Sequence, residues 1–141
     1  MKAIAAMAVL TGALTCLGAE QAELRGRVIC LLEERNGAQP ATNHAHVYGF
    51  KTAEKDWKLV RAKFSEALFV DKRLHERELL LKGKVLADGL SFEPITIRSI
   101  KDGVVHDLYY YCEICAIESV APEICVCCQG PVELVEKPLR L

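Results

Sequence analysis

Two pairs of cysteines near the C-terminus constrain this chain of 141 residues more than any other feature. Cys112 and Cys115 form one C-x2-C hook, and Cys125 and Cys128 form a second hook one short loop later. A Zn(II) ion takes four thiolates in a tetrahedron at about 2.3 Å, and each C-x2-C turn directs two sulfur atoms at one point. The spacing therefore predicts a structural zinc site made from these four cysteines.

The surroundings of the two hooks resemble known zinc-ribbon and heavy-metal-binding modules. Aromatic residues at 109–111 precede the first hook, and a Pro-Val-Glu-Leu segment at 131–134 follows the second. The chain departs from the ribbon pattern at Ala116 and Gln129, because ribbons usually place glycine directly after each hook. The resemblance implies a compact zinc-ribbon-like tail over residues 104–141.

Other fates for the cysteines stay open. Disulfides among them or a redox-active dithiol are the alternatives to zinc, whereas c-type haem needs a histidine after C-x2-C, and none is present. Cys30 and Cys127 are left over if zinc takes the other four. They form a disulfide between the two parts of the chain, or Cys30 stays a buried thiol, or Cys127 replaces a neighbouring ligand.

The N-terminal segment, residues 1–19, has the layout of a secretory signal peptide. Lys2 is followed by an uncharged, mostly apolar run that ends in small residues before charge begins at Glu20. We therefore expect a secreted or periplasmic protein, in a compartment where cysteines not held by a metal form disulfides. Lipoprotein anchoring through Cys16 is an alternative, although the residues before it fit that pattern poorly. No other stretch is long enough to span a bilayer.

The middle of the chain alternates polar and apolar residues in the manner of strands. Strands are predicted over residues 24–33, 44–51, 57–62, 78–87 and 92–100, and residues 104–111 lead into the cysteine segment. A change to helical spacing predicts a short helix over 65–76. Gly83 indicates a bulge inside its strand, and Pro94 indicates an edge position. Along 109–111, Tyr110 should face away from its two neighbours.

Three strands, a helix and two strands form the element order of the OB-fold. The Gly-x-Val motif at Gly26 and the Lys-Gly-Lys-Val motif at 82–85 resemble those of bacterial secreted OB-fold proteins. The prediction is mainly β: a small five-stranded OB-like Greek-key barrel with one short helix over 20–103, followed by the zinc ribbon. A generic small β-barrel or sandwich is the alternative. As a whole, the arrangement resembles a family of uncharacterised secreted bacterial proteins, which implies no activity.

Two histidines suggest a second metal site. His44 and His46 lie two residues apart, so on a strand both face the same side and are suited to Zn(II) or Cu(II). A third ligand, Cys30 or His106, would be needed. Two solvated histidines at a strand start are the simpler interpretation.

Composition and motifs exclude several functions. The 18 Lys and Arg residues against 19 Asp and Glu give a net charge of −1, which disfavours nucleic acid as a partner. No hydrolase or phosphate-binding motif is present, so no enzymatic activity is expected. The leading prediction is a non-enzymatic metal-binding module with a barrel face that binds a protein, peptide or glycan. The alternatives are a Zn/Cu trafficking or sensing protein and a thiol–disulfide redox protein.

Overall fold

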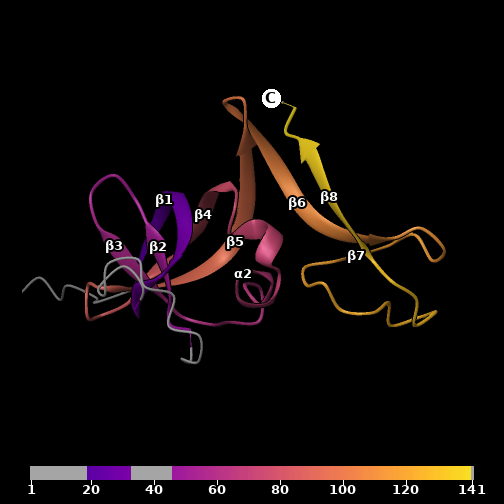
Figure 1. Cartoon of the computed structure of the whole chain (residues 1–141), viewed down its shortest axis with the longest axis horizontal. Coiled ribbons are helices and arrows are strands. Elements are labelled where there is room, and N and C mark those ends of the chain that lie inside the picture. Colours follow the sequence, from indigo (N-terminus) through magenta and orange to yellow (C-terminus); the bar gives the residue numbers. More distant parts are fainter. Residues whose placement is uncertain (1–18, 33–45, 141) are drawn as a thin grey trace, which may run out of the picture.

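The structure, a computed structural model, describes residues 19–32 and 46–140 (Figure 1). The predicted signal peptide, Cys16 included, lies outside these residues except for Ala19, and so does His44. The strands are β1 (Glu20–Cys30), β2 (Tyr48–Lys51), β3 (Asp56–Leu59), β4 (Glu78–Val85), β5 (Ser91–Lys101), β6 (Val104–Cys112), β7 (Ile117–Ser119) and β8 (Glu133–Pro138). They form one sheet in the order β3-β2-β1-β4-β5-β6-β7, and β8 pairs with β6. The prediction of a mainly β fold is confirmed.

The structure does not contain the predicted closed five-stranded barrel. β3 also lies against β5 in a short parallel contact, with Lys58 opposite Ser91 and Leu59 opposite Phe92. β5 does not end there, because its second half pairs with β6, which in turn pairs with β7 and β8. The sheet therefore runs on into the cysteine segment instead of closing, and the barrel prediction is wrong. We call residues 19–32 and 46–101 the body and residues 104–140 the tail.

The predicted helix is present but much shorter than expected. It consists of α2 (Ala67–Val70) and a 3₁₀ turn, η1 (Lys72–Leu74), with Asp71 between them in an extended conformation. The Asp71 carboxylate accepts a hydrogen bond from the backbone N–H of Arg73 at 3.0 Å and so caps η1. Asp71, whose side chain caps the second turn, therefore ends α2 within the segment whose helical spacing predicted a longer helix.

The predicted bulge at Gly83 is confirmed, and it explains how Pro94 fits into its strand. The register between β4 and β5 shifts between Lys82 and Gly83, and Gly83 lies opposite Pro94. A Cβ atom on Gly83 would lie only 2.1 Å from the carbonyl oxygen of Glu93, so only glycine fits this close approach. Pro94 is fully buried within an interior strand, which contradicts the predicted edge position. The bulge, rather than a free edge, accommodates the missing N–H donor.

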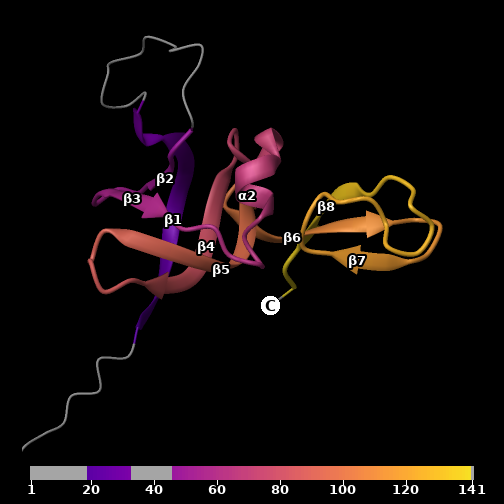
Figure 2. The ribbon, with the colours of Figure 1, turned by 90° about the horizontal axis from the view of Figure 1, so that it is seen from below.

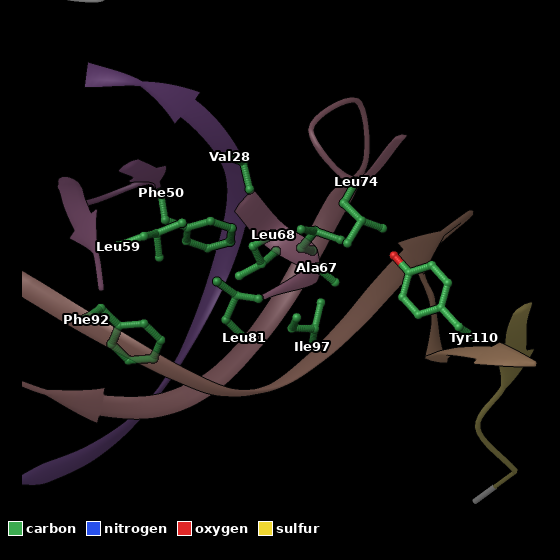
Figure 3. Close-up of a cluster of buried hydrophobic side chains, with 11 residues drawn as sticks. Val28, Phe50, Leu59, Ala67, Leu68, Leu74, Leu81, Phe92, Ile97 and Tyr110 are labelled. Carbon is green, nitrogen blue, oxygen red and sulfur yellow. The ribbon is translucent and has the colours of Figure 1, made fainter. Parts of the chain in front are cut away.

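The core lies between the curled sheet of the body and α2, and one tail residue extends it (Figure 3). The buried cluster consists of Val28, Phe50, Leu59, Ala67, Leu68, Leu74, Leu79, Leu81, Phe92, Ile97 and Tyr110. Tyr110 comes from β6 and is fully buried, whereas its neighbours Tyr109 and Tyr111 are only partly buried. The predicted alternation of these tyrosines is therefore confirmed.

Two buried carboxylates, Asp71 in the body and Glu136 in the tail, form polar contacts between the two parts. The Tyr110 hydroxyl donates to the Asp71 carboxylate at 2.7 Å, and the Arg73 guanidinium donates to the same carboxylate at 2.7 Å. On β8, the Glu136 carboxylate accepts from Arg77 at 2.7 Å and forms an ion pair with Lys101. Because Asp71 and Glu136 have side chains only 6% exposed, these contacts fix β6 and β8 of the tail against the body.

Those contacts lower the pKa of both carboxyl groups. Burial alone would raise the pKa of Asp71, but hydrogen bonds from Arg73 and Tyr110 outweigh it and lower the pKa to about 2. Burial would likewise raise the pKa of Glu136, and the hydrogen bonds from Arg77 and Lys101 lower it to about 2. Burial, followed by the bond to Asp71, raises the pKa of the Tyr110 hydroxyl well above its usual value. Both carboxylates are therefore fully charged at neutral pH.

Candidate metal centre

The four cysteines of the two hooks meet in the tail. Cys112 ends β6, Cys115 follows in the turn before β7, and Cys125 and Cys128 lie in the loop between β7 and β8. Their Sγ atoms all lie within 4.8 Å of one another, and the Sγ atoms of Cys112 and Cys128 are 3.5 Å apart. Zn–S bonds of about 2.3 Å in a tetrahedron place sulfur atoms about 3.8 Å apart. The cluster thus has nearly the dimensions that a tetrathiolate site requires.

The backbone after each hook has the conformation that glycine normally supplies in a zinc ribbon. Ala116 has a φ of 54° and Gln129 a φ of 57°, both in the left-handed region. The second hook is closed by hydrogen bonds from the N–H of Cys125 to the carbonyl of Gly130 and from the N–H of Gln129 to the carbonyl of Cys125, each 2.9 Å. The absence of glycine directly after the hooks therefore does not prevent the hook geometry.

Backbone donors support the sulfur atoms of the second hook. The N–H of Gly130 points at Cys128 Sγ at 3.4 Å, and a Cβ on Gly130 would lie 3.2 Å from that sulfur. Glycine thus lets the backbone approach the thiolate closely, as metal hooks commonly require. Gly130 follows the last hook cysteine by two residues in the sequence, which is where such a close approach is needed.

The thiols differ in how readily they ionise. Backbone N–H groups of Cys128 and Cys127 donate to the Cys125 sulfur and lower the pKa of that thiol to about 7. The N–H of Cys115 lowers the pKa of Cys112, but burial and the thiols of Cys128 and Cys125 outweigh it, so the pKa is raised. The hydrogen bond with Cys127, followed by burial, raises the pKa of Cys115. Because the pKa values of the Cys112 and Cys115 thiols are raised, the cluster needs a cation to ionise fully.

The leftover cysteines do not come together. Cys30 ends β1, which β4 and β5 separate from β6 in the sheet. Cys127 lies inside the second hook, and Figures 1 and 2 both show that loop at the opposite end of the molecule from β1. A disulfide needs Cα atoms within about 7 Å, so the structure does not support the suggested Cys30–Cys127 bridge. Cys127 is instead exposed, and its thiol lies close enough to Cys115 to raise the pKa of the Cys115 thiol.

The second metal site predicted at His44 and His46 gains no support. His44 lies outside the described residues, and the His46 ring stacks on Tyr48 with ring centroids 5.7 Å apart. His106, one of the suggested third ligands, has its Nδ1 2.9 Å from the carbonyl oxygen of Val104. Across residues 19–32 and 46–140, the hook cysteines are the one group of three or more side chains arranged to hold a metal ion.

In comparisons with protein families, curated proteins and solved structures, nothing matches this chain significantly. None of the helices in the described part of the chain combines the length and apolar character needed to cross a membrane. The geometry of the four hook cysteines is therefore the main indication of what this protein does.

Proposed function

We propose that this protein is a non-enzymatic zinc-binding module whose tail is held by one Zn(II) ion on Cys112, Cys115, Cys125 and Cys128. The observation that carries the proposal is the convergence of four Sγ atoms within 4.8 Å, from two segments joined only by a loop and β7. Thiolate sulfur favours Zn(II) over the hard cations Mg²⁺ and Ca²⁺. Four protein ligands leave no open position for a substrate, so the metal is structural rather than catalytic.

The segment between β6 and β8 has little else to hold it together. Beyond Tyr110, the buried residues of the tail in the described part of the chain are Cys112, Ala121 and Cys125. Two of these three are hook cysteines, so the metal site takes the place of a hydrophobic core. Zinc bound to such a segment supplies folding free energy directly.

The export predicted from residues 1–19 is part of the same proposal. A secreted or periplasmic location exposes thiols to oxidation, and coordination by zinc keeps the four hook cysteines reduced. Mass spectrometry of the protein recovered from cells should then show an N-terminus after Ala19. An intact N-terminus would contradict export by cleavage without touching the zinc site.

Metal analysis and thiol counting on the purified protein test the zinc site. We expect one zinc per chain, which Cys112→Ser and Cys125→Ser remove. Cys30→Ser and Cys127→Ser are the matched controls, because they make the same chemical change outside the ligand set and should retain the metal. A protein without stoichiometric metal, whose cysteines titrate as disulfides, would overturn the proposal.

A second candidate, metal transfer, rests on Cys127. Its exposed thiol contacts that of Cys115, so it can replace that ligand without a large movement of the chain. A fifth thiol speeds ligand exchange, which a purely structural site does not need. Zinc transfer to a chelator should then be several-fold slower in Cys127→Ser than in the wild type, at equal zinc content. Equal rates would contradict metal transfer through Cys127 and leave only the structural role of the zinc site.

A further inference from the structure

Long aliphatic side chains surround the metal centre and point into solvent. Ile114 lies inside the first hook and is 80% exposed, Val126 lies inside the second and is 86% exposed, and Ile124 just before it is 64% exposed. We call these three residues the tip. Scattered exposed apolar residues are ordinary, but three so exposed at one end of a small tail are unusual for a surface that contacts only water.

The metal centre brings these residues together. The convergence of the sulfur atoms fixes both hooks at one place, and the Cδ1 atom of Ile114 would lie 4.0 Å from a Cβ on Gly130, in the second hook. Figures 1 and 2 show this loop region projecting away from the body in both views. The tip residues therefore all lie within or beside the two hooks that the metal would fix, and the described part of the chain leaves all three exposed.

The surroundings of the tip are strongly acidic. Between Lys101 and Lys137 the chain has no Lys or Arg. Glu113, Glu118 and Glu123 are exposed there, and none of the three forms an ion pair within residues 19–32 and 46–140. Zn(II) with four thiolates adds a net charge of −2, since +2 − 4 = −2. An apolar surface with an uncompensated negative rim selects a partner of opposite charge.

We propose that the tip is a docking surface for a partner-protein segment that combines aliphatic residues with Lys or Arg. The inference rests on the proposed zinc site, because the metal holds the two hooks in register. Apolar side chains of the partner would cover Ile114, Ile124 and Val126, and its cations would meet Glu113 and Glu123 at the rim.

The charge argues against the two other occupants of such a surface. A second copy docked tip to tip would bring two sets of unpaired carboxylates and two anionic metal centres together. An anionic membrane surface would repel the same groups, whereas membrane-inserting apolar loops usually carry Lys or Arg beside them. A basic peptide segment satisfies both the apolar and the acidic part of the surface.

Selection of a displayed library of short random peptides on the zinc-loaded full chain tests the docking surface. The Ile114→Ser/Val126→Ser variant serves for counter-selection. We expect enriched sequences that contain aliphatic residues with Lys or Arg. Binding of the enriched peptides should weaken at least tenfold in that variant, and Glu113→Gln/Glu123→Gln should weaken it and flatten its salt dependence. Leu90→Ser/Glu54→Gln is the matched control, because both residues are exposed on the body.

Zinc content, measured for every variant, separates this proposal from the preceding one. A wild-type chain without zinc would overturn the proposed function itself. One zinc per chain without tip-dependent peptides, or with acidic ones, would overturn the docking surface alone. Tip-dependent binding to phosphatidylglycerol vesicles, or tip-dependent self-association in light scattering, would also overturn it, in favour of a membrane or a second copy.

Discussion

At the scale of single residues, Ala116 and Gln129 hold a backbone conformation that favours glycine. A left-handed conformation costs an L-residue about 1 kcal/mol relative to glycine. Ala116→Gly should therefore stabilise the zinc-loaded protein by up to about 1 kcal/mol, measured as the free energy of unfolding in urea. Ala116→Val should destabilise it, since a β-branched side chain resists positive φ more strongly. Equal stability of the wild type and the two variants would contradict backbone strain at Ala116.

Tyr110 is the residue through which the tail enters the core of the body. Tyr110→Phe removes the hydroxyl that donates to Asp71 at 2.7 Å but keeps the buried ring. Because the carboxylate loses one donor to a charged group, unfolding free energy should fall by about 1–2 kcal/mol. Tyr109→Phe, one position away on the opposite face, should change stability by less than about 0.5 kcal/mol. Thermal or urea unfolding of the two variants gives the comparison.

The residues of the metal centre were predictable, and those of the body–tail contacts were not. Cysteine at C-x2-C spacing identifies a ligand by its chemistry and its local turn, so Cys112 and Cys115 needed no knowledge of the fold. Asp71 and Glu136 are ordinary carboxylates in the sequence. Their importance arises from Tyr110 and Arg77, which lie 39 and 59 residues away along the chain. No local pattern records such a pairing.

At the scale of elements, strands were predictable where one face is buried. Residues 78–87 were predicted as a strand and β4 spans Glu78–Val85, with Leu79 and Leu81 fully buried two positions apart. The end of the helix at Asp71 was missed, because a side-chain cap competes with helical periodicity. The barrel prediction was wrong because it, too, relied on a local pattern. Element order does not record that β8 returns from beyond the hooks to pair with β6.

β8 depends on Glu136 for its place in the sheet. Glu136→Gln removes the charge that Arg77 and Lys101 share while keeping nearly the same shape. Arg77 then keeps a weaker, neutral partner, and the unfolding free energy should fall by about 1–3 kcal/mol. Amide hydrogen exchange should accelerate more in β8 than in β1. Glu133→Gln, at an exposed position of the same strand, is the matched control and should leave exchange unchanged.

At the scale of the whole molecule, one sheet connects two parts that are stabilised differently. The buried cluster belongs to the body except for Tyr110, whereas the far part of the tail relies on its cysteines. Removal of zinc by a chelator should therefore unfold the loops around β7 and leave the body folded. Hydrogen exchange should show lost protection between the end of β6 at Cys112 and the start of β8 at Glu133, and retained protection in β1, β4 and β8. Loss of protection throughout would mean that the metal holds the entire fold.

Acid should weaken the junction between body and tail in a defined pH range. Asp71 and Glu136 have pKa values lowered to about 2 from 3.8 and 4.5, so the unfolded chain binds protons more readily than the folded one. Their contribution is complete above about pH 5 and is lost as the pH falls toward 2, on the order of 2–3 kcal/mol for each group.

The metal titrates in the same direction, because acid protonates thiolates and releases zinc. The measurement therefore uses zinc-free protein, as the unfolding free energy from pH 6 to pH 2, with Asp71→Asn/Glu136→Gln for comparison. The wild type should lose stability steeply below about pH 4.5, whereas the double variant starts lower and falls less. Parallel curves would show that other carboxyl groups govern acid unfolding, and that the two buried carboxylates do not hold the tail to the body.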